Sequence, residues 1–220
     1  MTVAHKSAPR AGTRGNPEKT KAAILKAALH EFASEGVSGA RTDEIARSAN
    51  VNKALLYYYF KDKETLYGAV VETIFEGLRN QILEVLESDL PPRKKIEAYI
   101  GAHFDYIASS PHFPRLVQQE MMRAGRSKSP HLKKIAQIYF MPIFQRLSAT
   151  FQAGMAGGEF RQVNVRGTII CMVGSILHYF NTVPFATALG ESNPLSTEAI
   201  SAQRASVIDF VMHALVKEKV

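Results

Sequence analysis

Apolar residues recur with a helical period along most of this 220-residue chain. In residues 17–36 they fall three and four positions apart and form one stripe, made of Ile24, Leu25, Ala28, Leu29 and Phe32. No run alternates with a period of two for long enough to indicate a strand. The pattern predicts an all-α fold without an internal repeat.

Breaks in the periodicity and capping residues predict where the helices begin and end. Asn16 and Asp62 are expected to cap the helices that follow them, and Gly36 to end the first helix. The predicted helices span residues 17–36, 42–49, 53–59, 63–87, 93–109, 111–124, 131–153, 165–181 and 197–217. The helix at 131–153 is apolar nearly all round, so we expect it at the centre of its domain. Pro142 lies in its middle and should kink the axis, because proline removes a backbone hydrogen bond.

The stretch from residue 42 to 66 has the pattern of a helix-turn-helix. Thr42 is a candidate N-cap, Asn50 suits a left-handed turn and Asn52 can cap the next helix. The interior contacts are expected from Ile45, Ala46, Val51 and Leu56. The second helix then presents its other faces to a DNA groove, as a recognition helix does.

This stretch resembles TetR-type regulators, whose pattern runs T-x-x-x-I-A-x-x-A-G-V-S-x-G-x-L-Y-x-Y-F-x-x-K-x-x-L. The matching positions are Thr42, Ile45, Ala46, Ala49, Val51, Leu56, Tyr57, Tyr59, Phe60, Lys63 and Leu66. Asn50 and Ala54 replace the usual glycines and Asn52 replaces the usual serine. Each substitute suits the same backbone role, but Ala54 lies on the expected reading face, so the family's base preference does not carry over to this chain. The close match covers residues 22–71.

The resemblance implies a homodimer that binds a palindromic operator, usually as a repressor, and releases it when a small molecule fills the larger domain. It supports DNA contacts by Thr42, Tyr57 and Lys63. Helix position adds Lys53, Ala54 and Leu55 on the major-groove side and Tyr58 beside the phosphates.

Three parts are expected along the chain: a disordered basic arm (1–16), a DNA-binding domain (17–62) and a helical effector-binding and dimerisation domain (63–220). The arm is either a solvated tail or a segment that follows phosphates or enters a minor groove. Residues 1–63 hold 11 Lys or Arg and 6 Asp or Glu, so +5 of the net charge of +7 lies there. Double-stranded DNA is therefore the expected partner of this part.

Cysteine content and hydropathy indicate where the protein works. The single cysteine, Cys171, excludes an internal disulfide and fits a reducing cytoplasm. No early apolar run resembles a signal peptide, and the longest apolar stretch, 167–177, is too short to span a bilayer. We expect a cytoplasmic protein that makes no use of a membrane.

Two other classes of function compete with this interpretation. Enzyme motifs for phosphate, dinucleotide, zinc or serine chemistry are absent from the sequence, and the histidines lack ligand spacing, so we expect no catalysis, cofactor or metal. Residues 157–160 resemble a diguanylate cyclase signature but lack its extra acid and its βαβ context. Cys171 and His178 share a helix face without a third group to orient them. The second rival is a helix-turn-helix DNA-binding protein without a small-molecule input. Such a protein binds DNA constitutively or under the control of a protein partner.

An effector pocket is expected near the kink at Pro142. Its candidate lining is His103, Phe104, Glu120, Met121, Tyr139, Phe140, Phe144, Met172 and Phe180. Aromatic and methionine side chains suit a mostly hydrophobic ligand, although plain core packing explains them too. Glu120 and His103 fall on inward stripes, and a buried carboxylate needs a partner, either within the protein or on the ligand.

The last two predicted helices are candidates for the dimer interface. A face of mostly small residues on the first includes Gly167, Cys171, Gly174, Ser175 and His178. An apolar seam on the second includes Val207, Ile208, Val211, Met212 and Leu215. These residues either join two copies in a four-helix interface or fill the core of one chain.

Overall fold

The computed structural model describes residues 16–125 and 129–216, and its contacts divide the chain into two compact units at Val70/Val71. The described residues form helices, with one isolated β-bridge between Phe160 and Val216. The predicted all-α fold is therefore confirmed. The expected basic arm lies outside the described residues except for Asn16, so its role stays a prediction.

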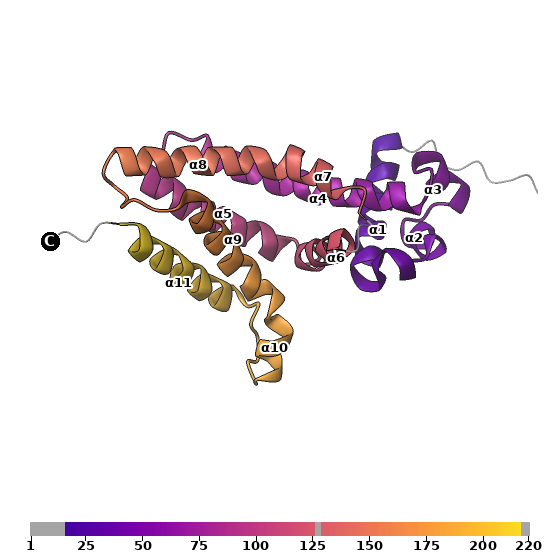
Figure 1. Ribbon diagram of the computed structural model, residues 1–220. Coiled ribbons are helices and arrows are strands. Elements are labelled where there is room, and N and C mark those ends of the chain that lie inside the picture. Colours follow the sequence, from indigo (N-terminus) through magenta and orange to yellow (C-terminus); the bar gives the residue numbers. More distant parts are fainter. Residues whose placement is uncertain (1–15, 126–128, 217–220) are drawn as a thin grey trace, which may run out of the picture. The chain divides into compact units, whose positions relative to one another are not determined.

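The first unit contains α1 (Pro17–Gly39), α2 (Thr42–Ser48), α3 (Lys53–Tyr59) and the first turns of α4 (Lys63–Leu86), drawn in indigo and purple in Figure 1. It ends inside α4 rather than at residue 62, because Leu66 and Tyr67 are buried in it. The ring of Tyr67 packs edge-on against Phe32, with centroids 5.2 Å apart. The start of α4 thus completes the core of the helix-turn-helix.

Local hydrogen bonds begin several of these helices as predicted. The side chains of Asn16, Asn52 and Asp62 each accept a backbone N–H two or three residues further on, at 2.7–3.0 Å. Asn50 adopts the left-handed conformation, with φ of 54°, between α2 and α3. The turn and its caps are therefore built from side chains next to them in sequence.

One predicted helix cap is wrong. Arg41, not Thr42, is the N-cap of α2, and its side chain makes no capping bond. The amide of Arg41 donates instead to Oε1 of Glu31, 3.0 Å away. Gly36 ends the first segment of α1 as predicted: its φ of 67° and ψ of 174° are not helical, and one further turn follows to Gly39.

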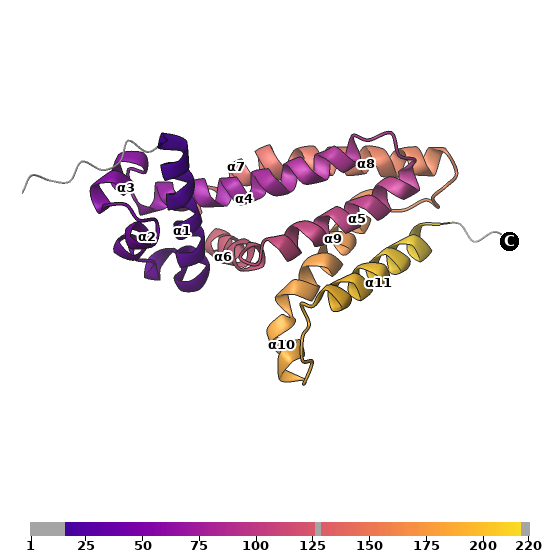
Figure 2. The same cartoon turned by 180° about the vertical axis from the view of Figure 1, so that it is seen from behind.

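The second unit contains the rest of α4 and the helices that follow it. They are α5 (Pro92–Ser109), α6 (Phe113–Gly125), α7 (Leu132–Ile135), the π-helix η1 (Ala136–Phe140), α8 (Met141–Ala156), α9 (Val165–Asn181), α10 (Val183–Ala188) and α11 (Thr197–Leu215). Figures 1 and 2 are views from opposite sides, and both show α7 and α8 running alongside α4. Ion pairs join them, from Lys134 to Glu72 at 2.5 Å and from Arg146 to Glu87 at 3.1 Å.

Helix α5, and not the segment 131–153, is the centre of this unit. It packs against α8, α9 and α11. Six of its residues are buried: Ile96, Tyr99, Ile100, His103, Phe104 and Ile107. The expected central helix keeps Ile138 and Met141 exposed. An apolar circumference alone therefore gave the wrong position, because part of that surface faces outward.

Pro142 changes the helix in a way that the sequence did not predict. The expected single helix is divided into α7, η1 and α8. The amide of Met141 donates to the carbonyl of Ala136, five residues back, in the π pattern. Buried residues Ile135, Tyr139 and Ile143 recur every four positions, whereas an α-helix has 3.6 residues per turn. The wider π turn keeps them on one face.

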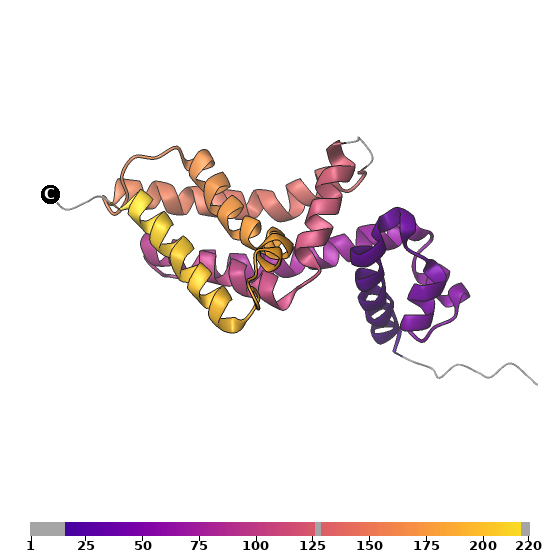
Figure 3. The ribbon, with the colours of Figure 1, turned by 90° about the horizontal axis from the view of Figure 1, so that it is seen from below.

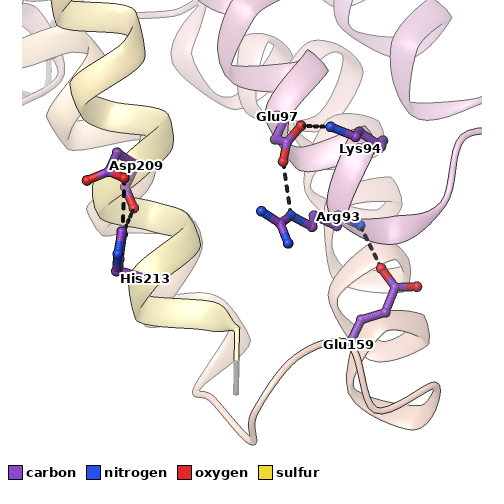
Figure 4. A network of polar contacts seen from close by, with 6 residues as sticks. All are labelled: Arg93, Lys94, Glu97, Glu159, Asp209 and His213. Carbon is purple, nitrogen blue, oxygen red and sulfur yellow. Dashed lines mark hydrogen bonds and ion pairs between the residues drawn. The ribbon is translucent and has the colours of Figure 1, made fainter. Parts of the chain in front are cut away.

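The residues at 157–160 form a helix-ending turn and no catalytic signature. Gly158 has φ of 75°, and the fully buried Phe160 packs where a side chain on Gly154 would collide with it. Oε2 of Glu159 accepts the backbone N–H of Arg93 at 3.2 Å, as Figure 4 shows. The acid thus holds the start of α5.

The C-terminal helices lie against one side of α5. Helix α11 packs on α5 and α9, an arrangement visible from below in Figure 3. The segment after α9, expected to be a loop, includes the short helix α10 instead. Phe185 and Leu189 are exposed on and just after α10.

Candidate nucleic-acid interface and apolar cavity

Helix α3 has one buried side and one open side. Leu56 is fully buried, whereas Lys53, Ala54, Tyr57 and Tyr58 are exposed. Tyr58 is 80% exposed, and its ring meets that of Tyr59 edge-on at 5.4 Å. Leu55, which was predicted to face the major groove, is half-buried, so only part of its side chain is open to DNA. The exposed side of α3 is short, aromatic and carries one cation.

That cation already has a partner on the preceding helix. Nζ of Lys53 lies 2.9 Å from Oδ1 of Asp43, and both side chains are largely exposed. The hydrogen bond and the attraction between the charges raise the pKa of Lys53 and lower that of Asp43. A base or phosphate that takes Lys53 must therefore compete with this carboxylate.

Three further predicted contact residues are hydrogen-bonded within the first unit. The hydroxyls of Thr42 and Tyr57 lie 3.2 Å apart and join α2 to α3. Nζ of Lys63 donates to the carbonyls of Ser38 and Ala40, at 3.2 and 3.1 Å. Lys63 thus fixes the start of α4 to the end of α1, a role that the sequence did not reveal.

A cavity of about 130 Å³ lies in the second unit. Its walls come from five pairs of residues, each pair one helical turn apart: Leu78 and Ile82, Tyr99 and His103, Phe140 and Phe144, Ile143 and Leu147, Ile169 and Val173. His103, Phe140 and Phe144 are among the wall residues predicted from the sequence. The aliphatic pairs were missed because each belongs to an ordinary apolar stripe, although their spacing of four was visible in the sequence.

The other predicted lining residues lie elsewhere. Phe104, Tyr139, Met172 and Phe180 are buried in the core outside this cavity. Met121 is 47% exposed on α6, so its predicted inward direction is wrong. Phe180 instead borders a separate, open cleft of about 440 Å³ with Arg115, Gln118 and Leu195.

Glu120 is fully buried, as its stripe predicted, and holds a neighbouring segment. Oε1 accepts a hydrogen bond from the hydroxyl of Ser129. The same Ser129 oxygen accepts the backbone N–H groups of His131 and Leu132, at 3.3 and 3.1 Å, where α7 begins. This chain of contacts supports the structural alternative for Glu120.

His103 and Tyr99 bring the polar groups of the cavity wall together. The Tyr99 hydroxyl lies 3.1 Å from Nδ1 of His103, at hydrogen-bonding distance. Burial lowers the pKa of His103 to about 4 and raises the pKa of Tyr99. The imidazole is therefore neutral at physiological pH.

The two helices predicted to form a dimer differ in what they expose. On α9, Cys171, Gly174 and His178 are exposed, and Gly174 borders open space. Gly167 and Ser175 are half-buried on the same helix. On α11 the predicted seam packs within its own chain: Val207, Val211, Met212 and Leu215 are buried and Ile208 is half-buried. The outward side of α11 carries Phe210 instead, 64% exposed.

Two properties of the described residues bear on other functions. No group of three or more His, Cys, Asp or Glu in the described part of the chain could hold a metal ion. Among the helices of residues 16–125 and 129–216, none is long and apolar enough to cross a membrane.

Comparison with known proteins agrees with this arrangement. The profile described as "Bacterial regulatory proteins, tetR family" matches residues 24–70, and "Tetracyclin repressor-like, C-terminal domain" matches residues 92–211. The transcriptional repressor SCO4008 of Streptomyces coelicolor is 38% identical over 116 residues, 53% of this chain and 57% of that protein. The transcriptional regulator RutR of Escherichia coli is 30% identical over 169 residues, 77% of each chain.

A solved structure shows the same fold. The crystal structure of the transcriptional regulator FadR from Bacillus subtilis, in complex with stearoyl-CoA, superposes with a TM-score of 0.69 at 19% identity, covering 88% of this chain and 98% of that one. The relatives are transcriptional regulators rather than enzymes. By its helix-turn-helix, its helical C-terminal unit and these matches, the chain belongs to the TetR family of bacterial transcriptional regulators.

Proposed function

We propose that this protein is a ligand-responsive repressor that binds a palindromic operator as a homodimer and releases it when a small apolar molecule fills the second unit. The main support is helix α3, which buries Leu56 and leaves Lys53, Ala54, Tyr57 and Tyr58 open to solvent. An exposed helix of this kind fits the major groove. The repressor activity of the relative SCO4008 supports the sign of regulation.

The contacts within the first unit refine the role of each predicted residue. Lys53 exchanges Asp43 for a base acceptor when DNA binds, and Ala54 allows close approach. Thr42 and Tyr57, already bonded to each other, present their hydroxyls together to the backbone or a base edge. Lys63 acts mainly by holding α4 on α1, because its ammonium group donates to two carbonyls there. The remaining N–H of that group donates to a DNA phosphate.

The homodimer forms through the outward sides of α9 and α11. Ile170 and Phe210, 59% and 64% exposed, are large apolar side chains on these sides. Between the two helices lies a cleft of about 470 Å³ lined by small or polar residues that include Ser175, His178, Ala202 and Ser206. Small residues allow helices to approach closely, so a second copy can cover this surface. The buried seam of α11 supports that surface from within.

Two matched substitutions test the dimer. Gly174 and Gly125 each border open space, so a glutamate at either position leaves its own chain undisturbed. Gly174→Glu should yield monomers in sedimentation velocity, because it puts a charge into the interface, whereas Gly125→Glu on α6 should remain dimeric. An intact dimer for Gly174→Glu would refute this placement.

The cavity between α4, α5, α8 and α9 supports control by a small molecule over control by a partner protein. FadR, which shares the fold, binds stearoyl-CoA. A ligand releases DNA here if it binds better to the conformation with low DNA affinity. A cavity already present in one chain gives such a ligand a place.

Selection of bound DNA from a random pool tests the proposal. The full chain should enrich a palindromic sequence, and a gel-shift assay should then show its release by a molecule that raises the melting temperature in a screen. Enrichment without any releasing molecule would favour the partner-controlled alternative. Failure to enrich any sequence would contradict operator binding.

A further inference from the structure

The cavity in the second unit has a size that restricts its ligand. Its volume is about 130 Å³. Drug-sized ligands occupy pockets of about 300–1,000 Å³. An apolar cavity of about 150 Å³, engineered into another protein and lined by Leu, Ile and Phe, takes up benzene. A single six-membered ring thus fits this space, whereas a long acyl chain needs more room.

The walls restrict the chemistry of the ligand as strongly. Eight of the ten wall residues are Leu, Ile, Val or Phe, and none is Asp, Glu, Lys or Arg. The two others, Tyr99 and His103, form a hydrogen bond with each other. Burial keeps the imidazole uncharged by lowering its pKa to about 4. An ionised ligand would lose its hydration and find no opposite charge.

The cavity wall contains two aromatic rings that are partly exposed. Phe140 and Phe144 line the cavity and are each 36% exposed, so they reach both the interior and the solvent. Phe140 ends the π-helical segment, and its ring packs edge-on against Phe75 at 5.2 Å. A small ring can enter between aromatic side chains that favour edge and face contacts.

From this geometry we propose that the site takes a neutral, apolar molecule of about the size of one aromatic ring, and discriminates against carboxylates and amines of the same size. The inference rests on the proposed function for the site's regulatory role, but the ligand class follows from the size and walls of the cavity. It narrows the mostly hydrophobic effector expected from the sequence to a small uncharged one.

Calorimetric titration of the full chain with benzene, benzoate and benzylamine tests the ligand class. Benzene should bind saturably at one site per chain, and the two ions should bind at least about tenfold more weakly. Either ion binding as tightly as benzene would overturn the proposal. So would the absence of saturable benzene binding.

Two variants and a matched control test where the ligand binds. Val173→Phe places a ring in the cavity and should weaken benzene binding at least about tenfold. Val117→Phe makes the same change at a half-buried position on α6 outside the wall and should leave it unchanged. Leu147→Ala, should Val173→Phe fail to fold, enlarges the cavity and should shift preference from benzene to naphthalene. Unchanged binding in a folded Val173→Phe, or unchanged preference in Leu147→Ala, would place the ligand elsewhere.

A gel shift with the selected operator separates this inference from the proposed function. Benzene binding that leaves DNA affinity unchanged would uphold the ligand class and contradict ligand-controlled release. Release of DNA by benzoate or benzylamine at the concentrations where benzene has no effect would uphold control by a ligand and overturn the ligand class.

Discussion

The DNA-binding helix and the cavity are built by different kinds of contact. Around α3, the turn and the caps depend on Asn50, Asn52 and Asp62, each acting on backbone within three residues of itself. The cavity instead joins α4, α5, α8 and α9, whose wall residues lie up to 95 positions apart, from Leu78 to Val173. Local polar contacts therefore shape the exposed side of α3, and long-range apolar packing shapes the cavity. This difference can be tested by substitutions on each side.

The largest expected effect is at the buried side of α3. Leu56→Ala should lower the free energy of unfolding by about 2–5 kcal/mol and abolish DNA binding, because Leu56 is fully buried. Chemical denaturation followed by circular dichroism measures it. Leu55→Ala, at the half-buried neighbour, should cost clearly less. Equal costs would mean that burial does not distinguish the two sides of α3.

The pH dependence of the free energy of unfolding tests the cavity wall through His103. The folded pKa of His103 is about 4, below an unfolded value of about 6.5. Above pH 6.5 the imidazole of His103 is neutral in both the folded and the unfolded chain, so it does not make the free energy of unfolding depend on pH. As pH falls from 6.5 to 4 the unfolded state binds a proton that the folded state does not, and stability should fall by up to about 3 kcal/mol.

Denaturant midpoints measured across this pH window check the effect of His103. His103→Gln should remove part of the slope, whereas His30→Gln, an exposed control on α1, should not. A wild-type slope that persists unchanged in His103→Gln would assign the proton uptake to other groups.

Removing a single helix cap should lower the stability of the protein less than the two changes above. Asn52→Ala should lower stability by about 1 kcal/mol, since its side chain accepts the Leu55 amide at 2.7 Å. Asn52→Ser keeps an oxygen acceptor and should restore most of the loss. Thermal unfolding of the three proteins makes the comparison. A serine variant as unstable as the alanine variant would contradict a capping role.

The smallest effect on stability, with a clear effect on binding, is expected at the exposed Lys53–Asp43 pair. Exposed ion pairs contribute little to folding. Lys53→Ala should leave the melting temperature nearly unchanged but reduce discrimination among operator variants by about tenfold. Asp43→Asn should strengthen DNA binding, because it frees Lys53 and removes a negative charge.

Competitive gel shifts with operator variants measure both changes. If Lys53→Ala retained the relative affinities, Lys53 would not read bases. If Asp43→Asn weakened binding, the acid would have a positioning role that the ion pair alone does not reveal.

The sequence by itself determined the features that short-range chemistry controls. It predicted the helical fold, the helix-turn-helix, the left-handed Asn50 and the caps at Asn52 and Asp62, because each depends on neighbouring residues. It also predicted that Glu120 and His103 are buried, since their positions on apolar stripes require it.

Tertiary structure decided which apolar helix faces pack against one another. It placed α5 rather than the segment around Pro142 at the centre, turned Met121 outward and covered Val211 and Met212 with their own chain. It paired Lys63 with the carbonyls that end α1. Periodicity shows that a helix has an apolar face, but only packing selects the helix that covers it, so the cavity between four helices could not be predicted from any one of them.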